Sequence, residues 1–266
     1  MTDPAAPVQY AVADGVATIT LNRPEAMNAL DLTTKEALKS AVEQAGTDPA
    51  ARVVVVTGSG KAFCVGQDLR EHITNISTRS MEEVWSTVPE HYAPIAAGLA
   101  GMDKPVIAAV NGVAAGAGAS IAFLCDFRVV ADTAGFNTAF TGIGLSCDTG
   151  ASWTLPRLVG PDKALELLMM PRTVSAAEAL ELGLATRVVP AAELDAEVSA
   201  LAATLSQGPT VAYGAVRRAV GFAATHTLTE SLAFEGDMMA RTGSSADHQN
   251  AVQSFIAKEQ PRFEGH

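Results

Sequence analysis

Residues 105–125 carry no charged side chain, and this stretch limits the folds open to the chain more than any other. It begins with a continuous apolar run, Val106–Val110, continues through three glycines, and then has the composition of a helix. A second continuous run, of β-branched residues, lies at Val53–Val56. Apolar runs without alternation are typical of strands buried on both faces of a sheet. Because such strands alternate with helical segments here, the pattern predicts an α/β fold.

The same stretch is nearly long enough to cross a bilayer, which takes about 20 apolar residues. It consists mostly of Ala and Gly and includes Asn111, so we interpret it as strand, turn and helix and expect no membrane segment. The chain has 266 residues, of which 48% are hydrophobic, enough for one large core and a small appendage. Its formal charge of −11 argues against a surface for nucleic acid or for an anionic membrane.

The three cysteines, Cys64, Cys125 and Cys147, are an odd number without C-x-x-C spacing. This usage is typical of reduced, buried thiols rather than of disulfides. No cluster of His, Cys and Asp has the spacing of metal ligands, so we expect no metal. The N-terminal sequence has neither the basic nor the apolar region of a signal peptide, and we expect a cytoplasmic protein.

Local patterns predict further elements. Val16–Leu21 has strand composition and ends before a proline, and Phe127–Val130 is another buried strand. Thr33-x-x-Glu36 has the pattern of a capping box, which predicts that a helix starts there. The apolar face of this helix is expected to consist of Leu38, Ala41, Val42 and Ala45.

Two longer regions differ from this alternating pattern. Residues 70–95 are polar and irregular, and we expect a mobile or ligand-facing segment there. Beyond about residue 195 the pattern is wholly helical, with a second capping box at Thr227-x-x-Glu230. We expect this helical tail to pack on a partner subunit.

The glycine turn at residues 112–118 precedes a helix, and helix N-termini attract negative charge. A dinucleotide site is disfavoured because Ile121 stands where the fingerprint G-x-G-x-x-G needs its third glycine. A phosphate loop is disfavoured because Lys61 is followed by Ala62, and Ser120 lacks the G-x-S-x-G pattern of a nucleophile elbow. The turn is also compatible with close packing alone.

Four segments, taken together and in order, resemble the crotonase family, the enoyl-CoA hydratase/isomerase superfamily. They read LNRPEAMNAL at 21–30, GKAFCVGQDL at 60–69, KPVIAAVNG at 104–112 and WTLPR at 153–157. The likeness continues through residues 175–189 and 255–263. It implies a spiral of ββα repeats over residues 1–195 and a helical trimerisation region over residues 196–266. The expected assembly is a homotrimer or a dimer of trimers.

The resemblance also implies the substrate, an acyl-CoA thioester, with no cofactor beyond the CoA that the substrate carries. Two backbone N–H groups in such enzymes hold the thioester oxygen while it becomes an enolate oxyanion. By position these donors are the amides of Gln67 and Ala117. The glycine turn would then serve a transient anion, and removing one such donor typically costs about 10²–10³ in rate.

Hydratases of this family carry two glutamates that manage the addition of water. Their positions fall on Ser120 and Phe140, neither of which can act as the needed acid or base. Asp148 stands where double-bond isomerases similar to the ring-1,2-epoxyphenylacetyl-CoA isomerase carry their acid/base, although Ser146-Cys147 replaces the usual Ile-Pro pair before it. The alternative role for Asp148 is the N-cap of a helix that begins near Gly150.

The remaining implied contacts are with the substrate. The positions near the CoA nucleotide are Arg23, Lys61 and the backbone of Ala26 and Met27, with Phe255 and Lys258 reaching a neighbouring subunit's ligand. Simple solvation is the alternative for each of these lysines and arginines. The positions around the thioester and the acyl chain are Phe63, Val65, Gly66, Asp68, Leu69, Gly116 and Phe140. For Asp68 we also expect a capping role on the helix that follows it.

The aromatic residues of the 70–95 segment leave several roles open. His72 is interpreted as a surface histidine, with a role as base as the alternative, and Trp85 and Tyr92 as either acyl-pocket or core aromatics. The sequence therefore predicts an enzyme that shifts the double bond of an enoyl-CoA, with Asp148 as the proton shuttle. The alternatives are an enoyl-CoA hydratase and a non-catalytic acyl-CoA-binding relative, whereas a nicotinamide oxidoreductase is disfavoured.

Overall fold

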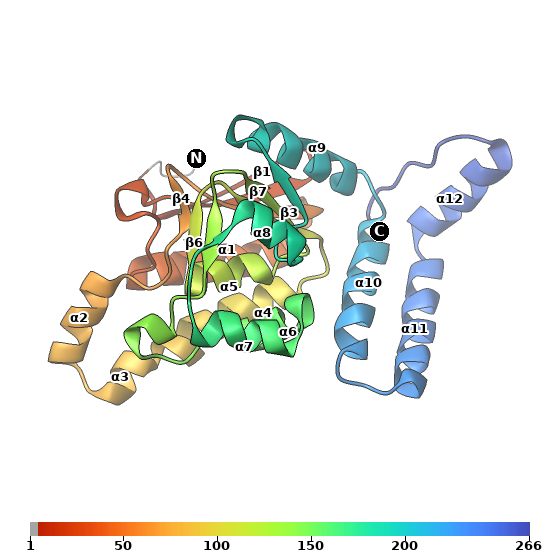
Figure 1. The fold of residues 1–266 in the computed structure, drawn as a ribbon. Coiled ribbons are helices and arrows are strands. Elements are labelled where there is room, and N and C mark those ends of the chain that lie inside the picture. The colour runs from red at the N-terminus through yellow and green to blue at the C-terminus, as the bar shows by residue number, and fades with distance from the viewer. Residues whose placement is uncertain (1–4) are drawn as a thin grey trace.

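A computed structural model describes residues 5–266, and a six-stranded sheet lies at its centre (Figure 1). The first two strands form an antiparallel pair, and every later strand of this sheet runs parallel to its neighbour. In spatial order the strands are β1 (Val8–Ala13), β2 (Val16–Leu21), β3 (Val53–Gly58), β5 (Val106–Val110), β7 (Phe127–Ala131) and β10 (Arg187–Val189). The predicted α/β fold is confirmed.

Helices cover this sheet, which is why its central strands contain few polar residues. The helix α1 (Leu32–Thr47) packs on β1 and β2 and on α4 (Ala93–Gly101), whereas α9 (Leu194–Ser206) packs on β3, β5 and β7. Every residue of β5 is buried. The predicted apolar face of α1 is confirmed, since the following residues are buried: Leu38, Ala41, Val42 and Ala45.

A second, smaller sheet contains the short strands β4 (Ala62–Cys64), β6 (Val113–Ala115), β8 (Gly135–Asn137) and β9 (Val174–Ser175). Each of the first three follows directly on a strand of the large sheet and is itself followed by a helix. The chain therefore repeats a ββα unit three times, as β3-β4-α2, β5-β6-α5 and β7-β8-α6. This repeat agrees with the spiral that the family resemblance implies.

The other helices surround the two sheets or form the C-terminal part (Figure 1). They are α2 (Leu69–Thr78), α3 (Met81–Trp85), a π-helix (Val88–Tyr92), α5 (Ala117–Phe123), α6 (Ala151–Val159), α7 (Pro161–Met169), α8 (Ala176–Glu181), α10 (Thr210–Ala223), α11 (Leu228–Gly243) and α12 (Ala246–Ala257). Short 3-10 turns lie at Pro24–Ala26, Thr141–Ile143 and Ala191–Glu193. None of the helices within residues 5–266 is long and apolar enough to cross a membrane.

Two local predictions were wrong. The capping box at Thr33-x-x-Glu36 does not form, because α1 begins at Leu32 and the Asp31 side chain caps it by accepting from the Thr34 amide at 2.8 Å. The segment 70–95 is largely helical rather than irregular, and most of its polar residues, though not His91, are exposed or half-exposed. The second capping box, at Thr227-x-x-Glu230, is confirmed at the start of α11.

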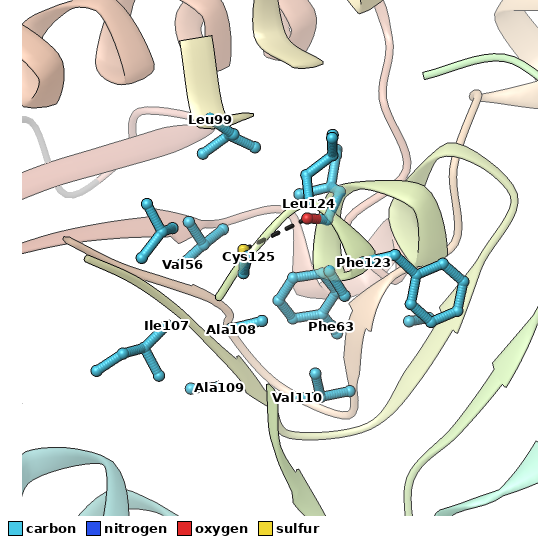
Figure 2. Packing of buried hydrophobic residues seen from close by; sticks show 14 of the residues in the cluster. Val56, Phe63, Leu99, Ile107, Ala108, Ala109, Val110, Phe123, Leu124 and Cys125 are labelled. Carbon is cyan, nitrogen blue, oxygen red and sulfur yellow. Dashed lines mark hydrogen bonds between the residues drawn. The ribbon is translucent and has the colours of Figure 1, made fainter. Parts of the chain in front are cut away.

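The core contains residues of both sheets and of the helices α1, α4, α5 and α9, and Figure 2 shows part of its packing. Phe63 is fully buried in it. The Cys125 thiol donates a hydrogen bond to the Ile121 carbonyl at 3.4 Å (Figure 2). Burial raises the pKa of both Cys64 and Cys125 to about 12, so these thiols behave as small apolar groups. The third cysteine, Cys147, is half-buried.

The C-terminal helices α10, α11 and α12 stand apart from the α/β body in Figure 1. Arg217 of α10 joins the two parts, donating to Asp126 and to the Leu99 carbonyl, each at 2.9 Å. The preceding helix, α9, contributes Leu194 and Val198 to the main core. The predicted boundary between the α/β core and the helical region, at residue 195, thus lies at the start of α9. The helices that stand apart from the α/β body begin at α10.

Candidate active site

The second sheet brings the two predicted amide donors together. Strands β4 and β6 are parallel neighbours, with Ala62 opposite Val113, so the segments that follow them leave the sheet side by side. A methyl group added to Gly66 would stand 3.1 Å from the Ala117 nitrogen. Gln67 follows Gly66 directly, so its amide lies beside that of Ala117.

The direction of the Gln67 amide is set by the peptide bond that precedes it. The Gly66 carbonyl accepts a hydrogen bond from the Leu30 amide at 2.8 Å, and the Asp68 amide donates to the Leu30 carbonyl at 3.1 Å. In a trans peptide the C=O and N–H groups point in opposite directions. The Gln67 N–H is therefore directed away from Leu30.

The Ala117 amide is oriented in the same way by the helix that it opens. The Gly116 carbonyl accepts from the Ser120 amide at 3.1 Å, along the axis of α5, so the Ala117 N–H points out of the helix N-terminus. Within residues 5–266, neither this amide nor that of Gln67 donates to a protein acceptor. Two backbone N–H groups are thus left without an acceptor among the described residues.

The glycines of this region are required by backbone geometry. Gly116 has φ of +52° and ψ of −125°, a backbone conformation that residues other than glycine rarely adopt. A Cβ on Gly118 would lie 2.1 Å from the Cys64 carbonyl oxygen, and one on Gly112 would lie 2.0 Å from that of Lys61. The close approach of α5 to β4 therefore depends on Gly118, and that of the turn before β6 to Lys61 depends on Gly112.

The two amides open into a cavity of about 140 Å³ whose wall is mainly apolar. Within the part of the chain that the structure describes, the residues that line this cavity are Val65, Gln67, Leu69, His72, Trp85, Thr87, Val88, Tyr92, Gly116, Ala117, Ala139, Phe140, Ile143, Leu145 and Asp148. Seven residues from the predicted site are among them: Val65, Gln67, Leu69, Gly116, Ala117, Phe140 and Asp148. Such a wall suits the acyl part of a thioester better than a nucleotide.

Asp148 is the one carboxylate among the described residues of the cavity wall. It is half-buried, and its Oδ1 accepts a hydrogen bond from the Thr149 hydroxyl at 2.8 Å. Burial raises the pKa of Asp148, although the Thr149 hydrogen bond and the charge of Lys35 oppose that shift. The alternative role as a helix N-cap is wrong, because α6 is capped by Gly150 without a side-chain hydrogen bond.

The two positions that replace the family glutamates lie close to the amide pair. Ser120 is buried within α5, and its hydroxyl donates to the Gly116 carbonyl at 3.2 Å. Phe140 lines the cavity, and its Cε1 would be 4.0 Å from a Cβ on Gly116. Neither side chain can take up a proton from water at neutral pH.

The helices of the 70–95 segment supply one wall of the cavity. His72 lines it rather than lying on the open surface, and its ring stands 5.4 Å from that of Trp85. Tyr92 is fully buried in the core but also reaches the cavity wall. Its hydroxyl donates to Gln67 Oε1 at 2.7 Å. His72 is half-exposed beside the cavity, so its role as a base stays a prediction, and the ligand-facing role of the segment agrees with the cavity.

Two predicted nucleotide or substrate contacts have protein partners. Arg23 lies between Asp31 and Asp68, with Nη1 to Oδ2 distances of 3.1 and 3.2 Å. Asp68 also caps α2 by accepting from the amides of Arg70 and Glu71, as predicted. These contacts lower the pKa of Asp68 through hydrogen bonds to Glu71 and Arg23, against the opposing effect of burial. Contact of Arg23 and Asp68 with substrate stays a prediction.

The other predicted positions lie outside the cavity wall. Lys61 and Met27 are exposed, and Ala26 is half-buried beside Met27. Phe255 and Lys258 lie at the end of α12, with Phe255 84% exposed. Phe63 faces the core, so its side chain is directed away from the cavity.

Five lining residues were missed by the sequence reasoning: Thr87, Val88, Ala139, Ile143 and Leu145. They lie in a π-helix and around a 3-10 turn, which have no periodic pattern to reveal them. Thr87 and Val88 could have been predicted from the sequence, because they lie within residues 70–95, the segment already expected to face a ligand. Within residues 5–266, no group of three or more His, Cys, Asp and Glu side chains is placed to hold a metal ion.

Comparison with known proteins agrees with this geometry. The family model described as Enoyl-CoA hydratase/isomerase matches residues 11–266. A protein of Rhodobacter capsulatus named "Probable enoyl-CoA hydratase" is 39% identical over 261 residues, covering 97% of this chain and 98% of that protein. The 1,2-epoxyphenylacetyl-CoA isomerase of Escherichia coli is 38% identical over 254 residues, covering 96% and 97%.

Solved structures give the same result. A Mycobacterium abscessus protein that carries the name enoyl-CoA hydratase/isomerase superposes with a TM-score of 0.93 at 41% identity, covering 97% of this chain and all (100%) of the other. An enoyl-CoA hydratase from Bacillus anthracis superposes with a TM-score of 0.91 at 30% identity, covering 98% and 100%. The similarity therefore extends over the α/β body and the C-terminal helices.

Proposed function

Since the chain belongs to the enoyl-CoA hydratase/isomerase family, we propose that it shifts the double bond of an enoyl-CoA thioester. The observation that carries this proposal is the cavity wall, which holds two free backbone amides and one described carboxylate, Asp148. Addition of water calls for groups that activate water and protonate the substrate, whereas a proton shift needs one group acting twice.

The proposed reaction converts a 3-enoyl-CoA into a 2-enoyl-CoA. The Asp148 carboxylate removes a proton from C2, and the electron pair moves through the thioester carbonyl to give a dienolate. The amides of Gln67 and Ala117 stabilise the charge on its oxygen. Asp148, now protonated, returns the proton to C4, and the double bond lies between C2 and C3. No atom is gained or lost, and no cofactor beyond the CoA of the substrate takes part.

The environment of Asp148 suits this cycle. A raised pKa brings the carboxylic acid closer to the pH at which it both accepts and returns a proton efficiently. The apolar wall around it, which includes Val65, Phe140 and Leu145, limits access of water to the dienolate. A half-buried carboxylate with one hydroxyl partner is thus prepared for proton transfer rather than for an ion pair.

Hydration is the second candidate, because a relative named as a hydratase is as similar to the chain, at 39% identity, as the named isomerase, at 38%. Ser120 and Phe140 argue against it, since neither offers a carboxylate to water. A non-catalytic acyl-CoA-binding protein is the third candidate, and the free amide pair argues against it.

A panel of acyl-CoA thioesters tests the proposal. Matched 2-enoyl and 3-enoyl substrates of the same chain length are assayed separately for double-bond shift and for formation of the 3-hydroxy product. We expect conversion between the two enoyl isomers with little hydration. Turnover to the 3-hydroxy product as the main reaction would instead identify a hydratase, and absence of both reactions would favour a binding protein.

A further inference from the structure

Lys35 has a buried ammonium group whose position the proton transfer does not explain. It is the fourth residue of α1, and only 3% of the residue is exposed. Its Nζ donates to the Thr87 hydroxyl at 2.8 Å and to Gln67 Oε1 at 3.2 Å, and Glu71 Oε2 lies 3.8 Å away. Burial lowers the pKa of Lys35, while the charge of Glu71 opposes that shift.

Burial of a lysine is a poor way to stabilise a fold, because an apolar side chain of similar size often does so better. The partners of Lys35 point to another role. Both Lys35 and Tyr92 donate to the same atom, Gln67 Oε1, and the Lys35 ammonium also stands 5.6 Å from the centre of the Tyr92 ring. The Gln67 side chain is thus held on one side by two buried donors.

The same element also holds the main chain of Gln67. Leu30, just before α1, bonds to Gly66 and Asp68 on either side of it. Residues 30–35 therefore hold Gln67 twice, through the Leu30 main chain just before α1 and through the Lys35 side chain within it. With both ends held, the Gln67 N–H has little freedom to turn away from the cavity.

We propose that Lys35 is a positioning residue, whose hydrogen bond to the Gln67 side chain keeps the Gln67 N–H directed at the thioester oxygen. This inference rests on the proposed function only in that it needs an acyl-CoA whose carbonyl binds the amide pair. A group that orients a donor in advance makes that donor more effective when charge develops on the oxygen.

The test measures the carbonyl directly, without turnover. Crotonyl-CoA labelled with ¹³C at the thioester carbonyl is bound to each variant, and its C=O stretching frequency is recorded by infrared difference spectroscopy. Bound to the wild type, the frequency should fall below its value in water. Lys35→Met and Gln67→Leu should each lose most of that decrease, and the double variant should lose no more than Gln67→Leu, because Lys35 acts on the amide only through the Gln67 side chain.

Lys39→Met is the matched control, since Lys39 lies one turn further along α1 and, among the described residues, donates only to the Glu90 carbonyl. It should keep the wild-type frequency. In assays of double-bond shift, Lys35→Met should lower kcat at least about tenfold with little change in KM, part of the roughly 10²–10³ that removing a donor costs.

The outcomes separate this inference from the proposed function. If the C=O frequency of the bound thioester is lowered equally in the wild type and in Lys35→Met, only the proposed role of Lys35 is overturned. The role of Lys35 is also overturned if the losses of the frequency decrease in Lys35→Met and Gln67→Leu add up in the double variant. If the C=O frequency is lowered in the wild type but not in Lys35→Met, and the wild type shows no double-bond shift in the activity assay, only the isomerase proposal is overturned. A wild type that leaves the frequency unchanged would overturn both.

Discussion

Gly66 and Ala117 lie so close together that a methyl group on Gly66 would stand 3.1 Å from the Ala117 nitrogen and 2.8 Å from the Ala115 carbonyl oxygen. Gly66 also has φ of +82°, in the region that favours glycine. The spacing between the two candidate donors therefore depends on the absence of a side chain at this position.

Gly66→Ala tests this dependence. The added Cβ should push the Gly66 and Ala117 segments apart, lowering kcat by at least about 10²-fold, the lower end for losing one donor. The positive φ should also reduce the free energy of unfolding by about 1–3 kcal/mol. Activity is measured with a 3-enoyl-CoA, and stability by urea unfolding.

Gly183→Ala is the control for strain alone. Gly183 also has a positive φ of +78°, but its added Cβ meets only the Leu158 carbonyl oxygen at 3.5 Å, an ordinary contact. This variant should lose stability and keep its kcat. If Gly66→Ala retains wild-type kcat, the spacing of the two amides does not limit the reaction.

Asp148→Asn tests the proton shuttle. The amide keeps an oxygen that can accept from the Thr149 hydroxyl but cannot carry the transferred proton. We expect double-bond shift to fall by at least about 10²-fold, while acyl-CoA binding and the melting temperature stay close to those of the wild type. Because Gly150 rather than Asp148 caps α6, Asp148→Ala should also show no loss from a missing cap.

A wild-type rate in Asp148→Asn would mean that another group moves the proton. His72 is then the residue to replace, since it lines the same cavity. His72→Gln should leave the rate of the otherwise unchanged enzyme within about threefold if Asp148 is the shuttle.

Hydration of crotonyl-CoA should be slow. Each missing acid or base typically supplies about 10²–10⁴ in rate, so an enzyme with Ser120 and Phe140 at those positions should be slower than an ordinary hydratase by several orders of magnitude. The measurement is loss of the enoyl absorbance together with detection of the 3-hydroxy product. Rapid formation of that product would show that some other group activates water.

Helices and strands were predictable from the sequence wherever a hydrophobic pattern extended over enough residues to show its period or its continuity. Val53–Val56 and Val106–Val110 indicated the buried centre of the large sheet, and the apolar face of α1 was correct residue by residue. The strands β4 and β6 were not predicted, because three residues define no period. Those strands nevertheless place the amide pair, which only the family resemblance indicated.

The candidate site was predictable only in part, for a related reason. Gln67, Ala117 and Asp148 were found because motifs carry them, and the structure brings all three to one cavity. Lys35 was missed, since a lysine in an amphipathic helix is normally solvent-exposed. Its ammonium group lies among Gln67, Thr87 and Tyr92, which are far from it in sequence.

Assembly of the chain into a trimer, or a dimer of trimers, stays a prediction that the surface of the C-terminal helices supports. Their exposed apolar side chains include Val216, Val220, Leu228, Leu232, Met239, Phe255 and Ile256. Large exposed apolar patches commonly mark an interface. Sedimentation at micromolar concentration should give the mass of three or six chains, and an active monomer would contradict this prediction.

The raised pKa of Asp148 makes two pH effects measurable in the same pair of proteins. For catalysis, the base must be ionised, so kcat/KM for a 3-enoyl-CoA should fall as the pH drops through the folded-state pKa, which lies above the ordinary value of 3.8. For stability the sign is opposite to that of a salt-bridged carboxylate. The folded state holds the Asp148 proton more tightly than the unfolded state does, so stability falls as the pH rises from about 3.8 through the folded-state pKa.

Asp148→Asn removes this contribution while leaving the other titrating groups in place. The free energy of unfolding of Asp148→Asn minus that of the wild type should therefore increase with pH across this window and become constant above it. Urea unfolding of both proteins at a series of pH values from about 4 to 8 measures the difference, which is independent of any catalytic assay. A difference that stays flat over the whole series would show that burial does not raise the pKa of Asp148, and the acid limb of kcat/KM would then belong to another group.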